Sequence, residues 1–515
     1  MARSSNKKTM INLICSLGVL ITNTMIGFFL SPYIVKNIGV EANGFVTLAN
    51  NFVTYANLIV TALNSMAARF ITLEYVQKNY KKANLYYNSV FWGNLIIVAV
   101  LLLPASYFIA KLQTFIDIPA DIVLDVKILF SFVFFNFFIT TGMPNWDCGV
   151  YVTNRLDRQY IPTMCTSTLR CVILLLTFTV LEPHVWYVGA AASIVALINL
   201  AVNGYNTAKL TPELKIRFED GKPIYSKSTI RELVGSGIWN SISSVGNLLL
   251  SGLDLIICNI FIDSTAMGII ALSKTLPSYM QQFSSSITQV FAPELIINYA
   301  RGDKETLLRD INRAMKITSV LLVVPLVGII VMSRDFYTLW VPSQDAELLS
   351  QLTIITCLGY AFTSGTQILY NVFSTVNKVK PNAIMMVLSG VASTILVFAL
   401  LRTTNLGIYA VAGCSVFTCW IRNMFYTIPY TAKYLGLKKT TFYPQVVMCF
   451  VNTVVLSVIG MTIRHFFVVE NWLEFFFVAA VIGSICLAVS MMIFLTKQER
   501  SLVINKVLNK IRRKK

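Results

Sequence analysis

The amino-acid sequence predicts an all-α polytopic membrane protein. We expect fourteen transmembrane helices, arranged as two six-helix bundles in parallel repeat plus two C-terminal helices. Of the 515 residues, 56% are hydrophobic and only 13% are charged, a balance that excludes an ordinary soluble globule. Apolar runs of roughly 20 residues, the length needed to cross a bilayer, recur along the whole chain. The basic residues gather in alternate loops between these runs.

Each predicted span is an apolar run of sufficient length. The basic start MARSSNKK leads into a full-length span without a small-residue cleavage site, so we expect the first helix to be retained. The second and seventh spans are the least certain, because both are rich in Asn, Ser and Thr. The spans are 12–34, 44–66, 88–110, 125–148, 163–181, 185–207, 232–262, 266–292, 315–333, 348–374, 382–401, 406–430, 443–464 and 472–496.

The loop charges predict the orientation, because cytoplasmic loops are enriched in Lys and Arg. One set of loops and both chain ends hold most of the 42 basic residues, whereas the opposite loops hold only Lys36, Lys111, Arg334, Arg402 and Arg464. Both termini are therefore expected in the cytoplasm, as an even span count also requires. Orientation accounts for the net charge of +18 better than nucleic-acid binding does.

The spans and loops divide the chain into five parts. The longest loop is charged and contains Pro212 and Pro223, which is typical of a linker. The C-terminal tail places apolar residues on one helical face and basic residues on the other; it is either an amphipathic helix on the anionic inner leaflet or a frayed basic end. The parts are an N-terminal six-helix bundle (1–207), a cytoplasmic linker (208–231), a C-terminal six-helix bundle (232–430), two additional transmembrane helices (443–496) and the basic amphipathic tail (497–515).

A weak self-similarity supports the parallel repeat. IVKNIGVEANGFVTLA at 34–49 resembles IICNIFIDSTAMGIIALS at 256–273. Residues 74–90 align with 298–314, at a constant offset of 224 that relates Tyr75 to Tyr299. Such repeats are common in secondary transporters, which bind substrate where the halves meet. Chance similarity between apolar segments is the alternative.

Polar residues within the spans predict a wet cavity. The second span carries nine polar side chains and the eighth carries at least ten, whereas hydrogen bonding between helices needs only one or two per helix. In the seventh span, NSISSVGNLLLSGLDLIIC at 240–258, an ideal helix places six polar residues on one face. We therefore expect spans one, two, seven and eight to line one cavity, with interhelical hydrogen bonding as the alternative. The amides chosen as substrate-binding are Asn50, Asn51, Asn240, Asn247 and Gln281.

Charges at membrane depth are costly and mark candidate sites. Asp254 and Lys274 lie in consecutive spans at similar depth, so we expect an ion pair; alternatively, Asp254 couples transport to H⁺ or Na⁺. Arg170 and Arg422 either line the cavity or extend to the inner surface. Arg69 either meets a phosphate at the cavity mouth or is an ordinary cytoplasmic-side cation. Arg69, Arg170, Lys274 and Arg422 complete the predicted substrate-binding set.

The sequence holds little material for catalysis or metal binding. The ten Cys are scattered without a CxxC motif, and the two histidines, His184 and His465, form no HExxH motif. We therefore expect a transporter, with no catalytic residues, no metal and no cofactor.

Five segments carry a resemblance to a known family. They are SMAARFITLEYVQKNYKKANLYYNSVFW (65–92), GSGIWNSISSVGNLLLSGLDLIICN (235–259), FYTLWVPSQDAELL (336–349), NVFSTVNKVKPNAI (371–384) and TTNLGIYAVAGCSV (403–416). They are similar to segments of the polysaccharide-biosynthesis membrane proteins of the O-antigen flippase (Wzx) type. These proteins belong to the multidrug/oligosaccharidyl-lipid/polysaccharide (MOP, MATE-like) superfamily.

The resemblance implies a function. It implies a flippase that moves an undecaprenyl-diphosphate-linked oligosaccharide across the bacterial inner membrane by alternating access, for O-antigen, capsular or other surface polysaccharide export. The implied partners are the polyprenyl-diphosphate-linked glycan, membrane lipids and other polysaccharide assembly proteins, with no nucleic acid. A H⁺ or Na⁺ gradient or the membrane potential would drive it. The alternatives are a MATE-like exporter of drugs or small solutes and, from another class, a membrane-embedded polysaccharide polymerase or glycosyltransferase.

Overall fold

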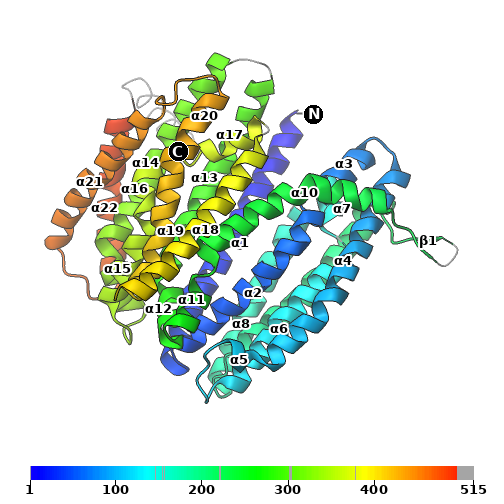
Figure 1. Cartoon of the computed structure of the whole chain (residues 1–515), viewed down its shortest axis with the longest axis horizontal. Helices are drawn as coiled ribbons and strands as arrows, with labels where there is room; N and C mark the ends of the chain where they lie inside the picture. The colour runs from blue at the N-terminus through cyan, green and yellow to red at the C-terminus, as the bar shows by residue number, and fades with distance from the viewer. Residues whose placement is uncertain are drawn as a thin grey trace, which may run out of the picture. The chain divides into compact units, whose positions relative to one another are not determined.

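The computed structural model describes residues 2–495 of the chain, except 145, 154, 156, 220–221, 301–303 and 377. The predicted amphipathic tail, 497–515, lies outside the described residues. The chain forms two compact units (Figure 1). Unit 1 comprises Met1–Leu248 and Leu255–Gly268, and unit 2 comprises Leu249–Asp254 and Ile269–Lys515.

Helices make up nearly all of the described chain, as the composition predicts. The first ten are α1 (Ala2–Asn37), α2 (Val40–Asn64), α3 (Ala67–Val76), α4 (Tyr80–Ala110), α5 (Leu112–Phe115), α6 (Val123–Gly142), α7 (Asp147–Val152), α8 (Asp157–Val180), α9 (Tyr187–Leu210) and α10 (Lys227–Asn247). A hairpin of two short strands, β1 (Phe218–Glu219) and β2 (Lys222–Pro223), precedes α10.

The chain continues through a π-helical turn, η1 (Leu248–Gly252), and a second one, η2, lies near the end of the twelfth span. The remaining elements are α11 (Asp254–Phe261), α12 (Ser264–Ser273), α13 (Thr275–Ala300), α14 (Lys304–Trp340), α15 (Ala346–Cys357), α16 (Gly359–Thr363), α17 (Leu369–Thr375), α18 (Val379–Thr403), α19 (Ile408–Arg422), η2 (Asn423–Thr427), α20 (Ile428–Tyr434), α21 (Tyr443–His465) and α22 (Trp472–Phe494).

Each of the fourteen predicted spans falls on one helix or on a run of consecutive helices. Within the described residues, nine helices are long and apolar enough to cross a membrane, or ten if a bent pair counts as one span. The multi-pass architecture is thus confirmed, whereas the number fourteen stays a prediction. One reason is that spans ten and twelve are divided into pieces, such as the 12-residue α15, that are too short to cross alone.

The polar stripe predicted for span seven is interrupted. α10 passes through η1 before α11 begins at Asp254, and the two helical parts are bent by 43°. A π-helical turn shifts the angular position of every later residue. The prediction that Asp254 continues the helical face of Asn240 and Asn247 is therefore wrong, because it assumed one uninterrupted α-helix.

The segment assigned to the linker is held firmly against α4 within unit 1. The Asn84 side chain accepts from the amide of Lys215 and donates to the carbonyl of Glu213 (2.9 and 2.6 Å). Asn88 repeats this pattern one helical turn later, with the amide of Arg217 and the carbonyl of Lys215, both at 2.9 Å. Two side chains of α4 thus satisfy backbone amide and carbonyl groups of the linker segment that have no partner in a helix or strand.

A close crossing of α2 and α10 depends on one glycine. A Cβ atom at Gly237 would lie 2.2 Å from the carbonyl oxygen of Ala62, whereas a Cβ at Gly235 would meet nothing within 4 Å. We expect Gly237→Ala to lower the free energy of unfolding by about 1–3 kcal/mol, because the backbones must separate.

The matched control is Gly235→Ala, two residues away on the same helix. It should leave stability unchanged or raise it slightly, since alanine favours helix over glycine. Thermal unfolding of the purified variants in detergent checks the pair. Equal melting temperatures for the two variants would contradict the proposed backbone contact.

In unit 2, the long helix α14 is the centre of packing. It contacts α13, α15, α21 and α22. Val323, Val327 and Met332 of α14 form a buried cluster with Leu456 of α21 and Val478 of α22. The two additional C-terminal helices therefore pack on α14 through apolar side chains.

Candidate functional site

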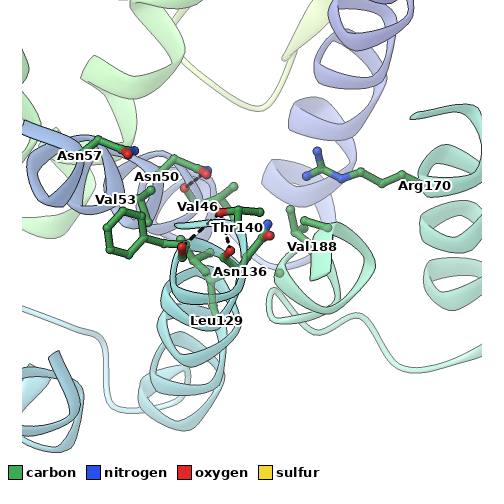
Figure 2. Close-up of a pocket in the computed structure, with 13 residues that line it drawn as sticks. Val46, Asn50, Val53, Asn57, Leu129, Asn136, Thr140, Arg170 and Val188 are labelled. Carbon is green, nitrogen blue, oxygen red and sulfur yellow. Dashed lines mark hydrogen bonds between the residues drawn. The ribbon is translucent and has the colours of Figure 1, made fainter. Parts of the chain in front are cut away.

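Four helices of unit 1 surround a cavity of about 200 Å³ (Figure 2). α2 contributes residues three or four positions apart, which a helix places on one face: Val46, Asn50, Val53 and Asn57. α6 contributes a second stripe, α8 one residue and α9 three residues. These are Leu129, Val133, Asn136, Phe137 and Thr140, then Arg170, then Val188, Gly189 and Ala192.

Arg170 supplies the only formal charge among these thirteen residues, none of which is acidic. Figure 2 shows its guanidinium extending from α8 toward the side of the cavity where Asn136 and Thr140 lie. Its Nε atom is buried and has no hydrogen-bond partner. A cation that no acidic residue of the cavity neutralises is costly at membrane depth. The cavity therefore favours a ligand that brings hydrogen-bond acceptors or negative charge.

The amides of the cavity are partly free to bind. Asn50 Nδ2 donates to the carbonyl of Val46 at 2.8 Å, and Thr140 donates to the carbonyl of Asn136 at the same distance. The Oδ1 atom of Asn136, however, is buried without a partner. The cavity thus presents an unsatisfied acceptor on α6 and unsatisfied donor capacity on α8. Hydroxyl groups next to an anionic group would satisfy both.

The size of the cavity limits what it holds. Pockets for drug-sized ligands usually measure about 300–1,000 Å³, more than the 200 Å³ available here. The cavity therefore suits one small polar group of a larger ligand.

Asp254 and Lys274 form the ion pair that the sequence predicts. Both belong to unit 2, and the Asp254 side chain is 6% exposed against 23% for Lys274. Lys274 Nζ also donates to the carbonyl of Ser251 at 2.9 Å. Because Asp254 neutralises Lys274, the pair adds no net charge for an anionic substrate.

Arg422 is buried in unit 2 instead of extending to a surface. Its guanidinium lies within hydrogen-bond distance of the Tyr370 hydroxyl (3.2 Å) and the Cys419 sulfur (3.4 Å). It also contacts Met386. The alternative that Arg422 extends to the inner surface does not hold, because its side chain is buried in this cluster.

The other predicted residues are dispersed. Arg69 lies on α3, beyond the end of the second span, and is exposed. Gln281 and Asn247 are exposed, and Asn51 and Asn240 are half-buried. None of these five lines the unit 1 cavity. The predicted common cavity of spans one, two, seven and eight would need residues of both units, so it stays a prediction.

Two polar residues of the cavity were not predicted, Asn136 and Thr140. In the sequence they appear as an asparagine and a threonine 4 residues apart in the largely aromatic run FVFFNFFITTG.

Hydrogen bonding between helices, the alternative role for polar residues in the spans, also occurs. Asn64 of α2 and Asn94 of α4 exchange two amide hydrogen bonds (3.0 and 3.1 Å). Within the described residues, no three His, Cys, Asp or Glu side chains gather in a way that could hold a metal ion.

Comparisons with known proteins address the fold and the family. A model of the family described as "Polysaccharide biosynthesis protein" matches residues 10–296. The chain is 26% identical over 504 residues to the uncharacterized membrane protein EpsK of Bacillus subtilis (strain 168), covering 97% of this chain and 98% of that protein.

Solved structures of transporters share the fold. The lipid II flippase MurJ in an inward closed conformation has a TM-score of 0.69 at 15% identity, over 95% of this chain and 100% of its own. An inward-facing multidrug resistance MATE family transporter of the MOP superfamily has a TM-score of 0.62 at 13% identity, over 81% of this chain and 96% of its own. These likenesses confirm the predicted all-α, multi-pass membrane fold.

Proposed function

The chain belongs to the polysaccharide biosynthesis protein family, and on that premise we propose that it is a flippase for a lipid-linked glycan. The fold it shares with the lipid II flippase MurJ supports this class of substrate. The hydrophobic part of a lipid-linked glycan can stay in the bilayer during transport, while its sugar and phosphate groups need a polar path across the membrane.

The observation that carries this proposal is the cavity of unit 1. Its one charge is the cation Arg170, its polar groups are amides and a hydroxyl, and none of its thirteen residues is acidic. Amides and a guanidinium are suited to sugar hydroxyls, carboxylates and phosphates. An organic cation would instead be repelled by Arg170.

In its specific form, the proposal concerns an undecaprenyl-diphosphate-linked oligosaccharide destined for O-antigen, capsular or other surface polysaccharide. The protein would lie in the bacterial inner membrane with both termini in the cytoplasm, as the loop charges indicate. Other polysaccharide assembly proteins would supply and remove the substrate. Alternating access would carry the glycan across the membrane, and the breaks in spans seven, eight, ten and twelve provide points where helices can bend.

A MATE-like exporter of drugs or small solutes is the second candidate, supported by the fold shared with a MATE family transporter. The absence of acidic residues among those that line the described cavity disfavours cationic drugs. A polymerase or glycosyltransferase is disfavoured because the family and the fold are those of transporters.

Deletion of the gene in its native host tests the proposal. The expected result is loss of the surface glycan and accumulation of its lipid-linked precursor, with the sugar facing the cytoplasm. Inverted membrane vesicles treated with a glycosidase reveal that orientation, and a strain with the gene restored is the control. Unchanged surface glycan without accumulated precursor would contradict the proposal.

A further inference from the structure

The hairpin of β1 and β2 projects from unit 1 beside the N-terminal end of α4 (Figure 1). Both arms of the hairpin are bound to that helix. Asn88 accepts from the amide of Arg217 at 2.9 Å on the first arm, and Ser89 accepts from the amide of Ser226 at 3.1 Å on the second. The amide of Ile224 donates to the carbonyl of Arg217 between the arms (3.4 Å). The height of the hairpin along α4 is therefore fixed.

The first arm reaches the level at which α4 enters the hydrocarbon core of the membrane. The ring of Phe218 meets the ring of Trp92 edge-on, with the two centroids 5.6 Å apart. From Trp92 to Lys111, at the C-terminal end of α4, the helix rises about 28 Å, which matches a hydrocarbon core of about 30 Å. With Lys111 at one boundary of the core, Trp92 lies at the other, a depth at which tryptophan is enriched. Phe218 therefore lies at the membrane surface, where a water-soluble partner does not reach.

The described arms of the hairpin, residues 215–218 and 224–227, combine apolar and basic side chains at an exposed surface. The exposed fractions of Ile216, Phe218 and Tyr225 are 36%, 59% and 44%. The exposed basic side chains are those of Lys215, Arg217 and Lys227. In the sequence, residues 215–227 hold four basic and two acidic residues. The loop charges place this segment on the cytoplasmic side, where the leaflet carries anionic lipids.

We propose that this hairpin docks onto the anionic cytoplasmic leaflet, with Phe218 inserted among the lipids and the basic side chains beside the lipid phosphates. The inference goes beyond the proposed function and does not depend on which substrate is carried. Lys and Arg lay their apolar stems along such a surface and extend their charged ends to the phosphate layer. Because α10 begins at Lys227, directly after the second arm, the docked hairpin also holds the start of span seven at the membrane surface.

Photocrosslinking of the full-length protein in liposomes tests the depth of Phe218. The probe p-benzoylphenylalanine, which bonds to C–H groups of nearby acyl chains when illuminated, replaces Phe218 and keeps an aromatic ring beside Trp92. Mass spectrometry should detect adducts with lipid, as it should for the probe at Leu103, which is 76% exposed within the third span. The matched negative control is the probe at Tyr80, 36% exposed at the start of α4. It lies about 18 Å from the level of Trp92 and should give no lipid adduct.

The same liposomes, made of phosphatidylglycerol and phosphatidylcholine in equal amounts, test the role of lipid charge. Adducts at position 218 should contain severalfold more phosphatidylglycerol than phosphatidylcholine, whereas adducts at position 103 should follow the bulk composition. Lys215→Gln/Arg217→Gln/Lys227→Gln should bring the ratio at position 218 toward the bulk value, because each basic residue near an anionic surface adds attraction.

Three outcomes would overturn the proposal. Lipid adducts at position 218 as rare as those at position 80 would place the hairpin in water. Adducts of bulk composition that the triple variant leaves unchanged would remove the role of lipid charge. A crosslink from position 218 to another protein in native membranes would identify a protein as the partner of the hairpin. If thermal unfolding shows that the protein with the probe at Phe218 does not fold, the probe at Tyr225 on the second arm answers the same question.

Discussion

Replacement of Arg170 with alanine is expected to reduce glycan transport about tenfold to a hundredfold, the loss that accompanies removal of a hydrogen bond to a charged group. Arg170 is the one charged residue of the unit 1 cavity, and its Nε atom is buried without a partner. The folded protein should be as stable as the wild type or more stable, since the substitution removes a half-buried charge that no acidic residue of the cavity neutralises. Transport in reconstituted liposomes and thermal unfolding measure the two effects.

Two further variants separate binding from structure. Arg170→Lys should retain part of the activity, because it keeps the charge but lacks the planar array of donors. Arg334→Ala is the matched control, since Arg334 is 72% exposed and pairs with Glu347 at the surface; it should transport normally. Equal transport activity in Arg170→Ala and Arg334→Ala would contradict the inference that the cavity is a binding site.

Removal of Lys274 is expected to destabilise the protein strongly. Lys274→Met leaves the carboxylate of Asp254, whose side chain is only 6% exposed, without its counter-ion. Loss of one partner from a buried pair costs about 3–5 kcal/mol. The penalty should shrink in acid, because protonation of Asp254 removes the unpaired charge. Thermal unfolding in detergent at neutral and acidic pH measures both effects.

The companion variants follow from the unequal exposure of the two side chains. Asp254→Asn should cost less than Lys274→Met, because the Lys274 side chain, 23% exposed, can turn toward water. Asp254→Asn/Lys274→Met should recover most of the lost stability, since no unpaired charge remains. Equal melting temperatures for Lys274→Met and the double variant would show that the pair does not act as a unit.

The positions of the spans were predictable because bilayer thickness imposes a length that apolar composition reveals. All fourteen predicted spans fall on helices. The Asp254–Lys274 pair was predictable too, because consecutive antiparallel spans bring residues at equal depth together. These are short-range consequences of sequence, and they do not depend on how distant helices pack.

The breaks and the cavity were not predictable in the same way. η1 is held by Ser393 and Thr394, which lie more than a hundred residues away in sequence, so its own residues do not reveal the turn. The cavity combines α2, α6, α8 and α9, and no periodicity within one helix shows which neighbours it meets. Asn50 and Arg170, which were selected by their polarity, line this cavity, and their role in binding substrate stays a prediction. Asn136 was hidden in an aromatic segment.

Direct transport of a lipid-linked glycan by the purified protein tests the proposed function most directly. Liposomes carry an undecaprenyl-diphosphate-linked oligosaccharide labelled on its sugar, and a membrane-impermeant reagent quenches the label only in the outer leaflet. With the wild-type protein, quenching should continue beyond the outer-leaflet fraction as inner-leaflet substrate is moved, and with Arg170→Ala it should continue much more slowly. Quenching that stops at the outer-leaflet fraction, as in protein-free liposomes, would contradict the assignment as a flippase.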